Sequence, residues 1–285
     1  GRMAAATDDA LTGLLAGTPY RALERIGRGG MGEVVVAEQI ALGKRVVVKL
    51  LHRQLSADPK LVERVFVEAR ALAALAHPNI VAVHDVGTTS AGRPYLVMER
   101  LSGVTLGAER RSRGVLPVDE TLAIVADILD ALGAAHALGL VHRDVKPDNV
   151  FLCDPDRHGR RQVKLLDFGI VKVLRPESVG PGSPRPLLPT EEGLLLGTPH
   201  TAAPEQIQCG AVDARADVYS VGVLLYTLLA GKGPFATSRG MVEILRAHVS
   251  QAPAPLRDAA QQAIPPALAR VVHKALEKHP EDRFS

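Results

Sequence analysis

A glycine-rich string near the N-terminus, GRGGMGEV at residues 27–34, has a spacing that suits phosphate binding. On its own it is also compatible with a turn-rich loop or with a dinucleotide-binding turn, and the latter requires a helix directly after the glycines. A β-branched run follows instead, so we expect the string to fold back as a hairpin. Because Gly27, Gly29 and Gly32 lack side chains, the backbone N–H groups of such a loop can approach a triphosphate closely.

Lys49 ends the next β-branched run, and a lone lysine in such a place is usually only solvated. Glu68 changes this interpretation, because it lies on the apolar stripe of a predicted helix that follows Pro59 and includes Val65 and Leu72. A carboxylate on a buried face is costly unless it is paired with a charge. We therefore expect Lys49 to pair with Glu68, which would hold the lysine towards phosphate oxygens.

Three short polar strings follow in order. HRDVKPDN covers residues 142–149, DFG covers 167–169, eighteen residues after Asn149, and APE covers 203–205. Each string alone is compatible with chance. Their order and separations, with Lys49 and the glycine string upstream, are not.

On these motifs, the chain resembles a Hanks-type (eukaryote-like) serine/threonine protein kinase and is similar to the bacterial members of that family. The resemblance covers residues 18–285 and implies phosphoryl transfer from ATP to Ser or Thr hydroxyls. It implies an α+β, bilobal protein-kinase fold, with a small antiparallel-β lobe that contains one key helix (19–100) and a larger, mainly α lobe (101–285). Residues 1–18 are then a loose lead-in with a tag remnant, before a single kinase domain that is truncated at its C-terminal end.

The resemblance assigns the catalytic roles position by position. Asp144 would orient the acceptor hydroxyl and accept its proton late in the reaction, because a carboxylate is a weak base for an alcohol. Lys146 would neutralise the migrating γ-phosphoryl group, and it favours Ser/Thr over Tyr as the acceptor, because tyrosine kinases usually carry Ala and Arg in that stretch. Asn149 and Asp167 would hold Mg²⁺, with Mn²⁺ as an alternative.

The resemblance also implies an ATP site. Lys49, paired with Glu68, would hold the α- and β-phosphates, Met98 would be the gatekeeper, and the backbone of Glu99 and Leu101 would bind adenine. The complete set is Ile26, Gly27, Gly29, Gly32, Val34, Val47, Lys49, Met98, Glu99, Leu101 and Phe151.

Regulation is expected to involve three residues. Thr198 would brace Asp144 and Lys146, and Arg143 would help to form a basic pocket for a phosphate group. We expect Thr190 to be the main autophosphorylation site, because a phosphothreonine can order a loop against arginine.

Other positions match structural features of the family. Asp217 would tie the catalytic loop to the following helix, and Arg283 would pair with Glu205. The regulatory stack of side chains is matched by Leu72, Val83, His142 and Phe168.

The chain departs from the family pattern at three places. Val47 replaces the usual Ala over the adenine ring, and Thr201 replaces an aromatic residue, which weakens the expected anchoring of the peptide-binding segment. The chain also stops at Ser285, where kinase domains usually have another helix.

Composition limits the partners. A net charge of +3, from 34 basic and 31 acidic residues, is too weak to indicate nucleic acid or an anionic membrane. Cys153 and Cys209 lack metal-ligand spacing and indicate reduced thiols. The longest apolar run, 221–230, is too short to span a bilayer, so no membrane contact is expected within this sequence.

The expected partners are ATP, protein substrates carrying Ser or Thr, and a second copy for trans-autophosphorylation. The expected location is cytoplasmic, either as a free enzyme or as the cytoplasmic domain of a membrane-anchored receptor kinase.

Periodicity predicts the remaining elements. We expect a turn at 41–44, a strand at 95–98, and helices over 119–136 and 217–230. The first of these helices would bury the face that carries positions 122, 125, 129, 132 and 136.

Three other classes remain as alternatives. A pseudokinase scaffold would lack at least one of Lys49, Asp144 and Asp167, and all three are present. A small-molecule phosphotransferase of similar fold would lack the long segment that ends in APE at 203–205. A Rossmann dehydrogenase is disfavoured by the β-branched run after the glycines.

Overall fold

The computed structural model describes residues 11, 13–29, 32–53, 59–168, 199–238 and 240–285. Its described residues fall into two units: those up to 77 together with 81–102, and 78–80 together with those from 103 onward. This boundary lies two residues after the predicted one. Residues 78–80 belong to the second unit because Ile80 bridges to Leu165 and the Asn79 side chain donates to the Val163 carbonyl at 2.9 Å.

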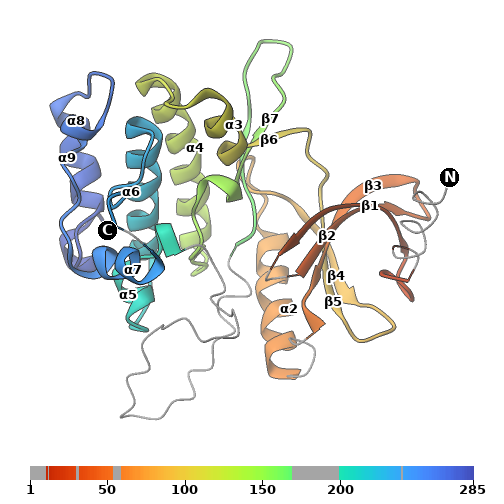
Figure 1. The fold of residues 1–285 in the computed structure, drawn as a ribbon. Helices are drawn as coiled ribbons and strands as arrows, with labels where there is room; N and C mark the ends of the chain where they lie inside the picture. The colour runs from red at the N-terminus through yellow and green to blue at the C-terminus, as the bar shows by residue number, and fades with distance from the viewer. Residues whose placement is uncertain (1–10, 12, 30–31, 54–58, 169–198, 239) are drawn as a thin grey trace, which may run out of the picture. The chain divides into compact units, whose positions relative to one another are not determined.

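The first unit is a five-stranded antiparallel sheet, in the order β1-β2-β3-β5-β4, with one long helix, α2, beside β4 (Figure 1). The glycine string joins β1 to β2 as an antiparallel hairpin, as predicted, and a turn with Gly43 at φ 61° joins β2 to β3. The bounds are β1 Tyr20–Gly29, β2 Gly32–Gln39, β3 Lys44–Leu51, α2 Pro59–Ala74, β4 Val83–Thr88 and β5 Pro94–Met98.

The strand register gives this sheet two chemically different faces. Directly opposite residues of paired strands lie on the same face, and successive residues alternate between faces. Val48 pairs with Val35 and with Val97, and all three are fully buried in the apolar core of the unit. Lys49, one residue further along, pairs with Val34 and therefore lies on the opposite face.

The segment before β1 is more ordered than the sequence indicates. Leu11 and Leu15 are 8% and 4% exposed and belong to the core on the Val48 face of the sheet. The Ser90 amide donates to the Ala16 carbonyl at 2.8 Å, so the segment is also attached to the β4–β5 connection. The prediction of a loose lead-in is therefore wrong for Leu11 and residues 13–18, because their leucines cover an apolar sheet face that would otherwise meet water.

The second unit is mainly helical, with a small antiparallel sheet in the order β6-β7-β8. Its strands are β6 Gly103–Thr105, β7 Val150–Cys153 and β8 Val163–Leu165. Its α-helices are α3 Leu106–Arg113, α4 Val118–His136, α5 Pro204–Ile207, α6 Ala214–Ala230, α7 Met241–Ser250, α8 Leu256–Ala259 and α9 Pro266–Ala275. The 3₁₀ helices are η2 Pro147–Asn149, η4 Pro199–Thr201 and η5 Pro280–Asp282.

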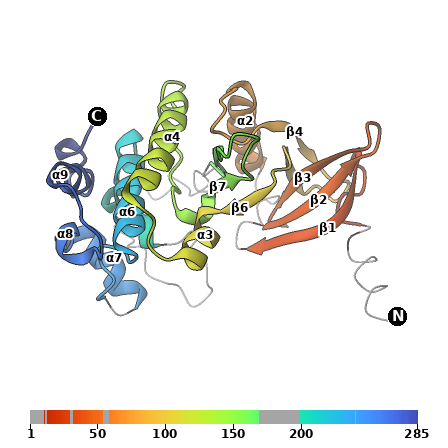
Figure 2. The same ribbon diagram turned by 90° about the horizontal axis from the view of Figure 1, so that it is seen from above.

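Helix α6 is the central element of this unit and lies between α4 and α9 in both views (Figures 1 and 2). It is buried on nearly all sides, and Gly222 allows α9 to approach closely, because a Cβ there would lie 2.9 Å from the Cβ of Ala275. No helix among the described residues is both long enough and apolar enough to cross a membrane.

Helix α4 forms where it was predicted, but it buries only part of the predicted face, on which Val125 and Leu132 are buried. Leu122 and Leu129, predicted to be buried, are 40% and 47% exposed, whereas Thr121, Ile124 and Ile128 are buried. Many residues of this helix are apolar or alanine, so periodicity alone supports more than one stripe. Contact with α6 and β8 selects the stripe that contains Ile124 and Ile128.

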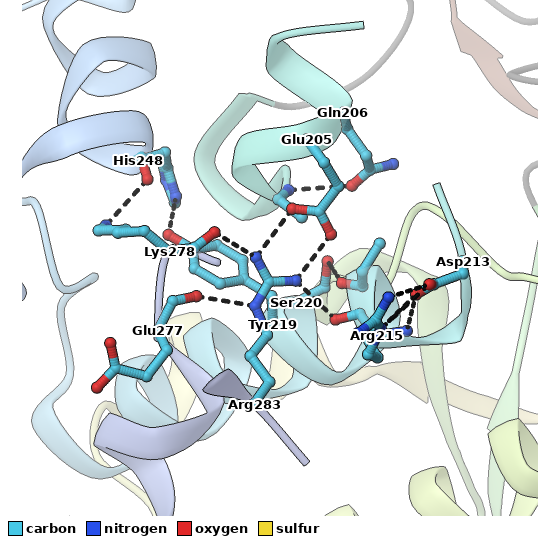
Figure 3. A network of polar contacts seen from close by, with 12 residues as sticks. Glu205, Gln206, Asp213, Arg215, Tyr219, Ser220, His248, Glu277, Lys278 and Arg283 are labelled. Atoms are coloured by element: carbon cyan, nitrogen blue, oxygen red, sulfur yellow. Dashed lines mark hydrogen bonds and ion pairs between the residues drawn. The ribbon is translucent and has the colours of Figure 1, made fainter. Parts of the chain in front are cut away.

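His248 of α7 is a buried histidine in a polar network near the C-terminus (Figure 3). The Tyr219 hydroxyl hydrogen-bonds to its Nδ1 at 2.9 Å, and its ring also hydrogen-bonds to the backbone of His200. Lys278 donates to the carbonyl of His248 at 2.9 Å. Burial, together with the charge of Lys278, lowers the pKa of His248 to about 3, so the folded protein keeps this ring neutral.

This network predicts a pH dependence of stability. Between pH 6.5 and pH 3 the unfolded chain binds a proton at residue 248 that the folded chain does not bind. The free energy of unfolding therefore falls as the pH falls through this window, by up to about 1.4 kcal/mol for each pH unit. We expect a shallower pH slope for His248→Gln in urea unfolding from pH 7.5 to 4.5. The exposed His84→Gln is the control, and an unchanged slope for His248→Gln would contradict the assignment.

Candidate active site

The HRDVKPDN string lies between α4 and β7 and begins with a buried histidine. The His142 Nε2 lies 2.9 Å from the Leu166 carbonyl oxygen, and its ring packs on Phe168 with centroids 4.6 Å apart. Burial lowers the pKa of His142, so the ring is neutral, with Nε2–H donating to Leu166. Its Nδ1 then accepts from the Asp144 amide at 3.2 Å. His142 thus connects Leu166, directly after β8, to Asp144, the residue predicted to orient the acceptor hydroxyl.

Asp217, in the first turn of α6, holds the same segment from the other side. Its carboxylate is fully buried and accepts from the backbone N–H of His142 at 2.8 Å and of Arg143 at 2.7 Å. The His136 Nε2 lies 2.8 Å from the same carboxylate. These contacts confirm the predicted tie between the HRDVKPDN segment and α6.

Two predicted residues of this segment, Lys146 and Asn149, converge on the carboxylate of a third, Asp144. Asp144 is 4% exposed, and its Oδ2 lies 3.0 Å from the Lys146 Nζ and accepts from the Asn149 Nδ2 at 3.0 Å. Asn149 also donates to the Asp144 carbonyl at 2.8 Å. Two donors on one oxygen hold the Asp144 carboxylate in a single orientation.

Asp167 is brought next to this cluster by the β7–β8 hairpin. Val150 pairs with Leu165, and the Leu166 amide donates to the Asn149 carbonyl at 2.8 Å, so Asp167 follows directly after a residue bonded to Asn149. Asp167 has φ 47°, a left-handed conformation that non-glycine residues seldom adopt. Backbone strain of this kind concentrates at functional sites.

In the first unit, the predicted nucleotide-binding residues gather on the sheet face that carries Lys49. Val34 pairs with Lys49, and Val47 pairs with Met98, which places these four side chains on one face. Ile26 of β1 is 53% exposed. Glu68 lies on α2 and is half-buried, and its pairing with Lys49 stays a prediction.

The other predicted nucleotide-binding residues are Glu99, Leu101 and Phe151, and each has different structural contacts. The Glu99 carboxylate accepts from the Ala82 amide at 2.8 Å, and its own amide donates to the Ala82 carbonyl at 3.0 Å, so this residue fixes the approach to β4. Leu101 follows β5 and is half-buried. In the second unit, Phe151 of β7 is half-buried and pairs with Thr105 and Lys164 in the small sheet.

The segment that includes η4 and α5 is firmly attached to the second unit (Figure 3). The Arg283 guanidinium makes two hydrogen bonds to the Glu205 carboxylate, at 2.7 and 2.8 Å, which confirms their predicted pairing. The Ser220 hydroxyl donates to the Thr201 carbonyl at 2.8 Å, and Thr201 is buried. Thr201, which stands where an aromatic residue is usual, is thus held through its backbone and not through an aromatic side chain.

Two predicted regulatory residues, Thr190 and Thr198, lie outside the described residues. The third, Arg143, adopts φ 62° directly before Asp144. Sequence reasoning did not identify Gln206, whose side chain donates to the Arg143 carbonyl at 3.0 Å and accepts from the Ala203 amide at 3.0 Å. Its position directly after the APE string was the only available signal.

The fold and this arrangement define a protein kinase domain. A family model described as "Protein kinase domain" matches residues 20–285, and the chain belongs to that family. The α+β fold with an antiparallel sheet in one unit and a mainly helical second unit, as predicted, is confirmed by this match and by solved structures. The kinase domain of PknI from Mycobacterium tuberculosis is similar with a TM-score of 0.69 and 30% identity, over 96% of this chain and 92% of that one.

Curated relatives that match most of this chain include bacterial serine/threonine-protein kinases. Pkn1 of Myxococcus xanthus is 41% identical over 97% of this chain and 38% of its own length. PksC of Streptomyces coelicolor is 39% identical over 95% of this chain and 47% of its own length. PknB of Mycobacterium tuberculosis is 37% identical over 93% of this chain and 40% of its own length. The chain thus spans less than half the length of these relatives.

Proposed function

We propose that this chain transfers the γ-phosphoryl group of ATP to Ser and Thr hydroxyls of proteins. The observation that carries the proposal is the convergence of Lys146 and Asn149, each at 3.0 Å, on one oxygen of the buried Asp144 carboxylate. A carboxylate held in one orientation can align an acceptor hydroxyl for in-line attack. Family membership and the names of the relatives point to the same reaction.

The charges around Asp144 suit this transfer. The transition state spreads negative charge over the phosphoryl oxygens, and Lys146 places an ammonium group beside the acceptor position. Asp144 itself is a weak base for an alcohol, so its role is to orient the hydroxyl and to take the proton late. Lys146 beside Asp144 is also the feature that favours Ser/Thr acceptors.

Asn149 and Asp167 would hold Mg²⁺, or Mn²⁺ in its place. The Asn149 Nδ2 donates to Asp144, so its Oδ1 is directed to the opposite side of the amide. One amide oxygen and one carboxylate are suitable protein ligands for Mg²⁺, which takes its other ligands from substrate phosphates and water. When bound, the ion supplies positive charge against the phosphate oxygens.

The glycine string supports nucleotide binding in the first unit. Gly32 is required by the fold, because it has φ 140° and a Cβ there would overlap the Leu50 carbonyl oxygen. At Gly29, by contrast, no described atom lies within 4 Å of a Cβ position, and at Gly27 the nearest is an ordinary 3.6 Å from Val34. The fold gives no steric reason for these two glycines, whereas close approach of phosphates to the backbone does. Ile26, Val34, Val47, Lys49, Met98, Glu99, Leu101 and Phe151 complete the proposed ATP site.

For regulation, we expect Thr190→Ala to lower activity only several-fold. Thr190 is proposed as the main autophosphorylation site, with Arg143 contributing to the phosphate pocket and Thr198 bracing the catalytic residues. Two glutamates follow Thr190 and supply part of the negative charge without phosphate. Phosphopeptide mapping after incubation with Mg-ATP checks this. Labelling of other nearby residues without Thr190, or a loss of activity as complete as for Asp144→Asn, would contradict it.

The proposed partners follow from the reaction. They are ATP, proteins that present Ser or Thr, and a second copy of the chain for phosphorylation in trans. A cytoplasmic location is proposed because Mg-ATP is plentiful there and because the spacing of Cys153 and Cys209 indicates reduced thiols.

The proposed function is tested by incubating the chain with Mg-ATP and a generic protein substrate and then identifying the phosphorylated amino acids. Phosphoserine and phosphothreonine are expected. Phosphotyrosine alone would contradict the acceptor class, and ATP binding without any transfer would show a scaffold instead of an enzyme.

A further inference from the structure

The backbone at Arg143, directly before Asp144, is held in a strained conformation. Arg143 has φ 62°, and for non-glycine residues the left-handed conformation costs on the order of 1–3 kcal/mol. Such a conformation persists only where the surroundings enforce it. The buried Asp217 carboxylate holds one end by accepting the Arg143 N–H at 2.7 Å. The other end is the Arg143 carbonyl, which belongs to the same peptide plane as the Asp144 nitrogen.

Gln206 holds that carbonyl. Its Nε2 donates to the Arg143 oxygen at 3.0 Å, and its Oε1 accepts from the Ala203 N–H at 3.0 Å. Because each end of the amide has a partner of the required polarity, only one amide orientation satisfies both bonds. A glutamine can therefore bind the Arg143 carbonyl and the Ala203 amide at the same time, which neither a purely donating nor a purely accepting side chain can do.

The base from which Gln206 reaches the Arg143 carbonyl is itself fixed. Its neighbour Glu205 makes two hydrogen bonds to Arg283, whose side chain is fully buried (Figure 3). A hydrogen bond positions its acceptor well only if the donor group is held in place. Here Gln206 is held because its neighbour Glu205 is bonded to Arg283, which follows η5 directly and is also bonded to α6. The chain of contacts runs from Arg283 through Glu205 and Gln206 to the residue before Asp144.

We propose that Gln206 is a positioning residue that fixes the peptide plane before Asp144 and couples this carboxylate to the Ala203–Gln206 segment. The inference rests on the proposed kinase function. Without the bond to its carbonyl, the Arg143–Asp144 peptide plane keeps the 3.2 Å hydrogen bond from the Asp144 amide to His142 but is held less firmly, and the Asp144 carboxylate loses its alignment with the acceptor hydroxyl. The turnover number should fall, whereas ATP binding, assigned to other residues, should not change.

Two substitutions test this role. Gln206→Glu keeps the size of the side chain and the acceptor for the Ala203 amide, but it replaces the donor to the Arg143 carbonyl by an oxygen. Gln206→Met is uncharged and removes both hydrogen bonds. The matched control is Gln208→Glu, which makes the same chemical change two residues later at an exposed position.

The measurements are kcat and KM for ATP and for a protein substrate, the Kd of Mg-ATP, and the melting temperature. For Gln206→Glu and Gln206→Met we expect kcat to fall about 10- to 100-fold, the equivalent of one or two hydrogen bonds at the transition state. We expect KM and Kd for ATP to stay within about twofold of wild type. Gln208→Glu should match wild type in every measurement.

The outcomes separate this inference from the proposed function. A wild-type chain without transfer activity would overturn both. An active wild type whose kcat is unchanged in both Gln206 variants would overturn the positioning role alone. If Gln206→Glu does not fold, Gln206→Met decides, and if neither folds, Gln206 is a structural residue and the proposal is wrong.

Discussion

Replacing Asp144 by asparagine is expected to lower phosphoryl transfer by roughly two to four orders of magnitude while the chain stays folded. Asparagine has the shape of aspartate, and its single oxygen can still accept from Lys146 and Asn149, as Oδ2 of Asp144 does at 3.0 Å. Its NH₂ group then occupies the place of the second carboxylate oxygen. That group donates hydrogen bonds, so it can neither align an acceptor hydroxyl as a proton acceptor nor take the proton.

The measurement is kcat for a protein substrate, with the melting temperature as the test of folding. Asp154→Asn, at an exposed position just after β7, makes the same chemical change and is expected to keep wild-type activity. A rate for Asp144→Asn within a few-fold of wild type would show that this carboxylate has no role in transfer.

The second large effect is on stability. Arg283→Met is expected to lower the free energy of unfolding by about 3–5 kcal/mol, as is typical when one partner of a buried ion pair is removed. All five N–H groups of Arg283 are used: two on the Glu205 carboxylate and the others on the carbonyls of Arg215, Glu277 and Lys278. Methionine satisfies none of these acceptors and leaves the Glu205 carboxylate without its charge partner in a largely buried place.

Urea unfolding of Arg283→Met checks this expectation, with Arg270→Met on the exposed side of α9 as the control. The double variant Glu205→Leu/Arg283→Met should regain part of the loss, because it removes the unpaired charge. A cost below about 1 kcal/mol for Arg283→Met would show that the ion pair contributes no more than an exposed one.

Much of the candidate site could be predicted because its residues are close together in the sequence and chemically distinctive. Asp144, Lys146 and Asn149 lie within six positions, and a short helical turn is enough to bring their polar atoms together. The long-range pair Glu205–Arg283 was predictable only through the family resemblance, since 78 residues separate its members. Charge type alone would not have selected Arg283 from the other arginines.

Other features depend on tertiary contacts that leave little trace in a sequence. The buried face of α4 could not be chosen from periodicity, because Leu122 and Leu129 fit an apolar stripe as well as Ile124 and Ile128 do. The burial of Leu11 depends on a sheet face formed much later in the chain. Glutamine has no distinctive signature, so the role of Gln206 became visible only through its two hydrogen bonds.

The central claim is the transfer of a γ-phosphoryl group to Ser and Thr, and parallel incubations with ATP labelled in the γ- or in the α-phosphoryl group test it most directly. The account predicts that label enters protein from γ-labelled ATP only, that it is recovered as phosphoserine and phosphothreonine, and that Asp144→Asn abolishes most of it. Incorporation from α-labelled ATP would show nucleotidyl transfer, and no incorporation from either would show a nucleotide-binding scaffold. Either result would contradict the account.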